Sequence, residues 1–84
     1  MADLPLIVAE FERNAREVVR VSIGEFRGRK TIDVRTWYRD GTTLKPGRSG
    51  ITMALVHLPA LADGLQLALI RAEAGGLIDD GRGE

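Results

Sequence analysis

Cysteine is absent from this chain of 84 residues, and His57 is its single histidine. Without cysteine there is no disulfide framework and no thiolate metal site. The two serines, Ser22 and Ser49, have no base partner in the pattern that would make either of them a nucleophile. The composition therefore predicts a protein that is not an enzyme and that holds neither a metal nor a cofactor.

Long hydrophobic segments are also missing. No uninterrupted apolar run reaches the roughly 18–20 residues that span a bilayer. Residues 1–5 lack the basic start and the apolar segment of a secretory signal. We therefore expect a single small cytoplasmic domain with no membrane partner, in which a hydrophobic core alone gives limited stability.

Net charge is zero, with 12 basic and 12 acidic residues, but the two signs are unevenly distributed. Residues 13–48 contain 10 basic and 4 acidic side chains, a balance of +6. The rest of the chain contains 2 basic and 8 acidic side chains, a balance of −6. Because local charge attracts a polyanion, the central segment is the predicted binding region.

Alternating side chains in this segment predict a hairpin. Val19, Val21 and Ile23 alternate with polar residues in a strand that ends at Phe26, and residues 31–39 alternate in the opposite parity. A tight turn over residues 28 and 29 would place Ile23 opposite Val34. The same turn would place Ser22 opposite Arg35 and Arg20 opposite Trp37. This register keeps the aliphatic side chains together on one dry face.

The opposite, polar face of this hairpin is predicted to carry aromatic rings among cations. Its members are Arg20, Phe26, Arg35, Trp37 and Arg39, with Arg27, Arg29 and Lys30 at the turn. Bases stack on such rings while cations meet phosphates, so the pattern is typical of a surface for unpaired nucleic acid. The alternative is an ordinary solvated face with Trp37 at a sheet edge.

The remaining segments complete an α+β pattern. Residues 43–45 predict a brief third strand that ends at Pro46-Gly47, and residues 51–55 predict a fourth. Residues 1–16 read as an N-terminal lead-in with a possible short amphipathic helix, because Ile7 and Phe11 have helical spacing. Residues 75–84 read as a flexible acidic tail.

A C-terminal helix is predicted from Leu58 or Pro59 to Ala74, covering the dry face of the sheet. Its apolar arc is wider than one small sheet requires, which indicates a homodimer formed through the helices. The predicted dimer contacts are Leu61, Leu65, Leu67, Leu69 and Ile70.

Four segments, Val19–Ser22, Glu25–Arg29, Ile32–Tyr38 and Leu44–Ile51, give the chain a family resemblance. Residues 17 to about 70 resemble the single-stranded-DNA-binding domain of the transcriptional coactivator positive cofactor 4 family, of a bacterial or phage type. The resemblance implies a curved four-stranded antiparallel sheet followed by a helix, spanning residues 17–74. It also implies a homodimer that binds unpaired or melted DNA without reading sequence, in transcription regulation or genome maintenance.

The resemblance places the family's binding residues at Phe26, Arg27, Arg29, Arg35, Trp37, Tyr38, Lys45 and Arg48. Trp37 is expected to face outward as the main stacking ring, with Tyr38 inward or at the edge. A location near the nucleoid follows as an expectation. RNA binding and a dimeric adaptor that binds proteins of the transcription machinery remain the alternatives.

Overall fold

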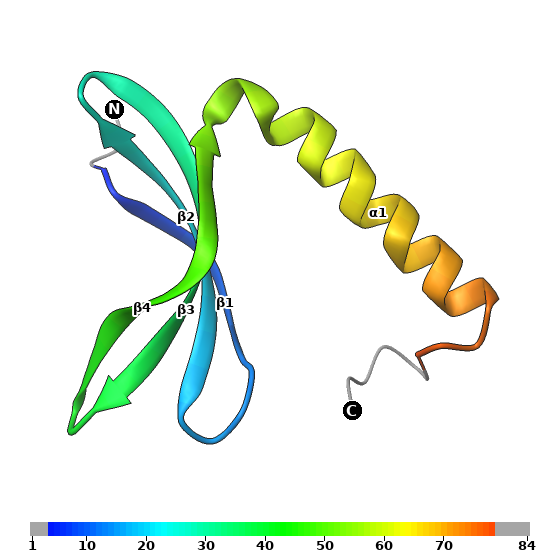
Figure 1. Cartoon of the computed structure of the whole chain (residues 1–84), viewed down its shortest axis with the longest axis horizontal. Helices are drawn as coiled ribbons and strands as arrows, with labels where there is room; N and C mark the ends of the chain where they lie inside the picture. Colours follow the sequence, from blue (N-terminus) through cyan, green and yellow to red (C-terminus); the bar gives the residue numbers. More distant parts are fainter. Residues whose placement is uncertain (1–3, 79–84) are drawn as a thin grey trace.

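The alternating segments form one antiparallel sheet, followed by a helix that extends from it (Figure 1). In this computed structural model, which describes residues 4–78, the strands are β1 (Leu6–Glu12), β2 (Glu17–Phe26), β3 (Arg29–Asp40) and β4 (Thr43–Ala54). A 3₁₀ turn, Leu55–His57, leads into α1 (Leu58–Ala74). The strand order is β1-β2-β3-β4, which confirms the predicted four-stranded α+β fold with a C-terminal helix.

The β2–β3 turn sets the register of the sheet. Arg27 and Gly28 both have positive φ, 53° and 80°, as a two-residue type I′ hairpin turn requires. The turn therefore lies one position earlier than predicted, and the predicted partners are wrong by two residues: Val21, not Ile23, lies opposite Val34. A shift of two residues preserves the faces, because side chains alternate with a period of two.

Residues 6–12 form a strand, so the short helix predicted for the lead-in is wrong. Phe11 pairs with Val19 of β2, and Glu10 pairs with Arg20, with a bulge near Val8. The spacing of the apolar residues suited a helix equally well, but pairing with β2 supplies backbone hydrogen bonds that an isolated short helix lacks. The β1–β2 loop is fixed by Asn14, whose side-chain oxygen accepts hydrogen bonds from two backbone N–H groups at 2.9 Å.

Residues 43–54 form one continuous strand rather than the two that the sequence predicted. The register with β3 shifts between Arg35, which pairs with Gly50, and Trp37, which pairs with Pro46, so residues 47–49 form an irregular bend that begins directly after Pro46. Proline is tolerated there because β4 is an edge strand and the bend is a bulge. Because β4 takes up both predicted strands, the additional strand that makes the sheet four-stranded is β1.

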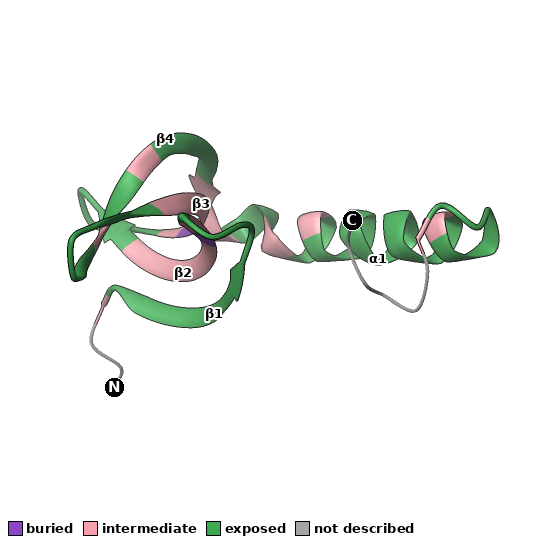
Figure 2. Cartoon of the chain, turned by 90° about the horizontal axis from the view of Figure 1, so that it is seen from below, coloured by how far each residue is buried: buried purple, intermediate pink, exposed green. Residues whose placement is uncertain are grey.

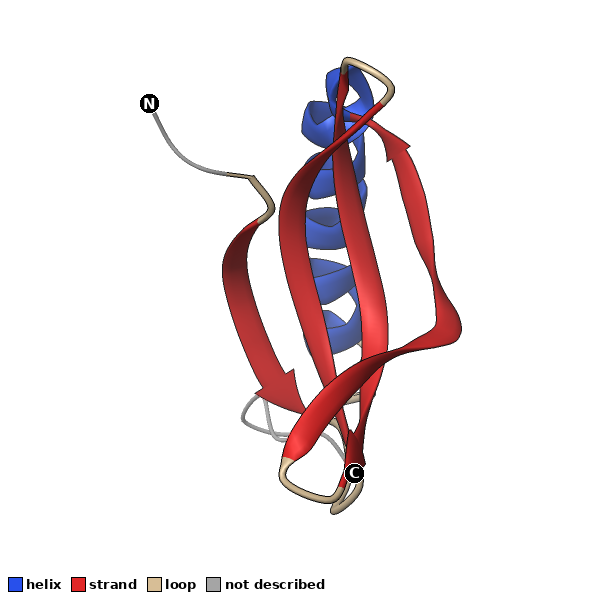
Figure 3. Cartoon of the chain, turned by 90° about the vertical axis from the view of Figure 1, so that its left-hand side faces the viewer, coloured by secondary structure: helices blue, strands red, loops and turns tan. Residues whose placement is uncertain are grey.

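The core within one chain is very small. Among the described residues only Val18 and Ile32 are fully buried, with 1% and 3% of their surface exposed. The helix lies on one side of the sheet (Figure 3) but diverges from it, and its surface is almost entirely exposed (Figure 2). The expectation that α1 covers the dry face within one chain is therefore wrong beyond its first turns.

The helix ends where the sequence predicted, at Ala74, followed by Gly75 and by Gly76 with a φ of 69°. The predicted flexible tail begins here, and residues 79–84 of it lie outside the described part of the chain.

Close packing of β4 against β3 gives a test of the register. A Cβ atom at Gly50 would lie 2.7 Å from the Val34 carbonyl oxygen and 2.8 Å from the Arg35 Cα. Gly50→Ala should lower the free energy of unfolding by about 1–3 kcal/mol, because backbone must move. Gly24→Ala is the matched control: it lies in β2, with only a 3.4 Å contact to Thr31. Its stability should stay within about 1 kcal/mol of the parent or rise. Equal urea midpoints for the two variants would contradict the register.

Candidate nucleic-acid interface

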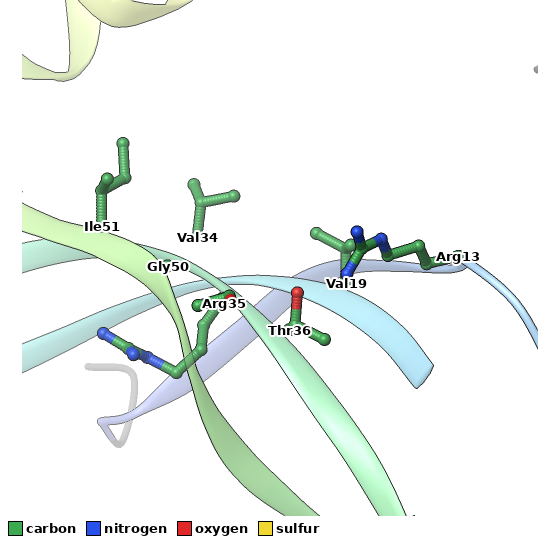
Figure 4. Close-up of a pocket in the computed structure, with 8 residues that line it drawn as sticks. Arg13, Val19, Val34, Arg35, Thr36, Gly50 and Ile51 are labelled. Carbon is green, nitrogen blue, oxygen red and sulfur yellow. The ribbon is translucent and has the colours of Figure 1, made fainter. Parts of the chain in front are cut away.

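The two faces of the sheet differ in chemistry. Val34 and Ile51 point to one side, toward α1, while Arg35 points to the other (Figure 4). The register places Arg20, Arg35, Phe26 and Trp37 together on this second face, as the alternation predicted. We call it the polar face.

One end of the polar face is the hairpin tip, formed by Phe26, Arg27, Arg29 and Lys30. All four are exposed, and 63% of the Phe26 surface is accessible. The Arg27 guanidinium lies 5.0 Å from the centroid of the Phe26 ring, and Lys30 pairs with Glu25 at 3.6 Å. Arg29 makes no ion pair with any of residues 4–78. The tip therefore offers an exposed ring beside unpaired cations.

The opposite end of the sheet carries Tyr38, Arg39 and Lys45, which we call the rim. Lys45 Nζ lies 2.8 Å from Asp40, and Arg39 lies 3.5 Å from Glu12 while donating to the Ala15 carbonyl at 3.3 Å. Tyr38 is 42% exposed. The cations at the rim are thus partly neutralised within the chain.

The tip and the rim are separated along the strands. Phe26 pairs with Arg29 and Glu17 pairs with Tyr38, at the two ends of the ten-residue strand β2. Ten residues at about 3.3 Å each span roughly 30 Å. The predicted binding residues are therefore distributed along an extended surface rather than gathered in one pocket.

Arg35 braces the bend of β4. Its guanidinium donates to Asp33 Oδ1 at 3.0 Å, Thr52 Oγ1 at 3.0 Å and the Gly47 carbonyl at 3.1 Å. Thr52 also donates to Asp33. The sequence predicted Arg35 as a phosphate contact and gave no sign of this structural role. Arg48, one residue beyond Gly47, is exposed and makes no ion pair within the described chain.

Trp37 is covered rather than open. The Arg20 guanidinium lies 4.4 Å from the centroid of the indole, and Arg20 Nε donates to Glu10 at 2.6 Å. The indole Nε1 is buried and has no acceptor among the described residues. The expected order of exposure is therefore wrong: Tyr38 is exposed, whereas Trp37 is half-buried between Val18, its partner on β2, and Arg20.

Two acidic residues of the polar face, Glu10 and Glu12, were missed because residues 1–16 were read as a lead-in. They pair with Arg20 and Arg39, two of the predicted binding residues. The signal was present, since both glutamates alternate with Phe11, as residues on one side of a strand do.

The dry face is mainly apolar. A hollow of about 430 Å³ is lined by Val19, Val34, Gly50 and Ile51 together with the polar residues Arg13, Arg35, Thr36 and Ser49 (Figure 4). A neighbouring hollow of about 310 Å³, between sheet and helix, is lined only by apolar residues: Phe11, Val19, Val21, Ile32, Val34, Leu58, Leu61, Ala62 and Leu65. Among the predicted dimer residues, Leu61 and Leu65 line this hollow, while Leu67, Leu69 and Ile70 are exposed on α1.

The helical segment Leu55–Ala74 is 20 residues long and contains an 18-residue window with a mean hydropathy of 1.2, enough by length and composition to cross a membrane. Asp63, Arg71 and Glu73 interrupt the segment, and its apolar surface continues into that of the sheet. This continuity favours an apolar protein surface as its cover. Residues 4–78 contain no group of three side chains suited to a metal ion.

A curved antiparallel sheet with rings and cations on one face, followed by an apolar helix, defines a small α+β domain with one face suited to a polyanionic ligand. The family model of the transcriptional coactivator p15 (PC4) matches residues 14–64, and the chain belongs to this family. The resemblance seen in the sequence is thus confirmed.

Similar proteins extend this assignment. An RNA polymerase II transcriptional coactivator of Drosophila melanogaster is 41% identical over 44 residues, which are 52% of this chain and 40% of that protein. The chain thus spans less than half of that relative. A crystal structure of a PC4 homolog from Burkholderia pseudomallei superposes with a TM-score of 0.71 and 30% identity, covering 81% of this chain and 93% of the homolog. A second crystal form gives 0.70 and 31%, over 76% and 96% of the two chains.

Substitution can separate the structural role of Arg35 at the bend of β4 from a role in binding. Arg35→Lys should lower the free energy of unfolding by about 1–3 kcal/mol, since an ammonium cannot reproduce the forked contacts with three partners. Arg29→Lys, at the exposed tip, should leave stability unchanged. Urea denaturation measures both, and an unchanged midpoint for Arg35→Lys would exclude the brace.

Proposed function

We propose that this protein is a homodimeric, sequence-independent single-stranded-DNA-binding protein that acts in transcription regulation or genome maintenance. The observation that carries the proposal is the hairpin tip, where the exposed Phe26 ring lies among unpaired cations on the polar face. An exposed ring of this kind is costly in water unless a partner covers it. Family membership supports nucleic acid as that partner.

The residues suggest how a strand would bind. Bases would stack on Phe26 and Tyr38, at about 1–3 kcal/mol each, while Arg29 and Arg48 meet phosphates. Neither contact reads the edges of bases, so binding would be sequence-independent. A single strand suits the site because the bases of a duplex are already stacked on one another.

The apolar face supports the dimer. Four apolar side chains are each at least half exposed in one chain: Phe11, Leu65, Leu67 and Ile70. Phe11 and Leu65 line the apolar hollow between sheet and helix, and Leu67 and Ile70 lie further along α1. A second copy would cover this surface without blocking the polar face, which points the other way. Two polar faces would then form one longer binding surface.

Location and partners follow as further proposals. We place the protein in the cytoplasm, associated with the nucleoid, and include proteins of the transcription machinery among its partners. The ion pairs that neutralise Lys45 and Arg39 favour a protein-binding adaptor as the second candidate, because they reduce the charge available to phosphates.

Removing the tip ring tests the main proposal. Phe26→Ala should weaken binding of labelled oligo-dT by about 5- to 150-fold, equivalent to about 1–3 kcal/mol. Leu77→Ala removes an even more exposed apolar side chain beyond the helix and should leave affinity unchanged. Fluorescence anisotropy at fixed salt measures each dissociation constant.

The same titration separates the alternatives. The parent should bind oligo-dT more tightly than the same sequence as a duplex. Equal affinity for oligo-rU would broaden the ligand to RNA. No affinity for any oligonucleotide would refute the proposal and leave the adaptor as the better account.

The dimer has its own test. The parent should sediment at twice its mass of 9.2 kDa, whereas Leu65→Asp should sediment as a monomer because it places a charge at the apolar hollow. Thr42→Asp adds the same charge at the β3–β4 turn and should remain dimeric. A monomeric parent at micromolar concentration would contradict the proposal.

A further inference from the structure

We infer that Glu10 holds Arg20 over Trp37 as a gate, so that the indole becomes a stacking surface only when a phosphate replaces Glu10 on Arg20. This inference rests on the proposed function and adds a control element to the same surface. We call the three residues, which lie on the adjacent strands β1, β2 and β3, the covered stack.

The register makes the covered stack a product of the fold. Glu10 lies directly opposite Arg20 in the β1–β2 pair, and Arg20 Nε lies 2.6 Å from Glu10 Oε1. Trp37 lies opposite Val18. Val18 precedes Arg20 by two residues and so lies on the same side of β2, which lets the Arg20 guanidinium reach across the indole. The Arg20 guanidinium is thus held at its edge by the Glu10 carboxylate and on its flat face by the Trp37 indole.

The two arginines that flank Trp37 on the same side of β3, Arg35 and Arg39, cannot substitute for Arg20 at the indole. Arg35 is committed to Asp33, Thr52 and the Gly47 carbonyl. Arg39 contacts Glu12 and the Ala15 carbonyl. Of these three, Arg20 alone lies over an aromatic ring, so its release uncovers a stacking surface.

The closed arrangement can be displaced by a phosphate. The Glu10 side chain is 41% exposed and that of Arg20 is 18% exposed, so solvent reaches the ion pair from the carboxylate side and weakens it. A phosphate offers the guanidinium a bidentate partner of greater charge. The buried Trp37 Nε1 has no acceptor among residues 4–78, and such an unpaired donor disfavours the closed state.

Glu12 provides a matched control. It lies two residues from Glu10 on the same side of β1 and pairs with an arginine, Arg39, at 3.5 Å. Within the described chain, no aromatic ring lies beneath Arg39. Glu10→Gln and Glu12→Gln therefore remove the same charge from the same strand, but only the first acts on the covered stack.

Trp37 is the only tryptophan of the chain, so its fluorescence reports the gate directly. In the free protein, Glu10→Gln should increase acrylamide quenching of Trp37, whereas Glu12→Gln should match the parent. Oligo-dT affinity of Glu10→Gln should rise about two- to five-fold, the equivalent of losing one ion pair that competes with phosphate. Glu12→Gln should give a smaller rise.

Unchanged quenching in Glu10→Gln would overturn the gate, whatever the affinity for DNA. Equal quenching increases in the two glutamine variants would overturn it too, because a general loosening of β1 would then explain both. The quenching comparison contains no DNA, so it is independent of the proposed function, which fails separately if the parent does not bind oligo-dT.

Discussion

The pairing of β2 with β3 is the constraint on which the rest of this molecule depends. A two-residue turn at Arg27 and Gly28 fixes which side chains lie opposite one another. The alternating aliphatic residues of the hairpin, from Val19 to Ile23 and at Ile32 and Val34, are thereby sent to the face beside α1. Arg20, Phe26, Arg35 and Trp37 lie on the other face, together with the buried Val18 that pairs with Trp37. One face is left to bury against protein and the other to meet a charged ligand, so the two proposed functions of the surface, assembly and binding, do not compete for the same side chains.

Much of this division was readable in the sequence, because a period of two is a strong signal wherever one face is apolar. The face on which Val21 and Val34 lie was predicted correctly, although the predicted partner of Val34, Ile23, is two residues away from its observed partner, Val21. The identity of the edge strand was not readable. Residues 6–12 suit a helix or a strand in isolation, and only the presence of β2 beside them decides between the two.

The candidate site was predictable in membership but not in arrangement. Alternation placed Phe26, Arg20 and Trp37 on one face, as the structure has them. It could not show that Arg20 would lie over the indole, since that contact needs a third strand and the carboxylate of Glu10. Nor could it show Arg35 as a brace, since its partners at Gly47 and Thr52 come from a bend more than ten residues further along the chain.

The turn residue Arg27 has a wider consequence. Its φ of 53° lies in the left-handed region, where asparagine or glycine is accommodated with less strain. A long cationic side chain at this position means that the hairpin gives up some intrinsic turn propensity to carry a charge at its apex. The simplest physical reason for an arginine here is selection for a ligand contact at the apex of the hairpin rather than for an easily formed turn. At position 27, better folding and better function therefore require different residues.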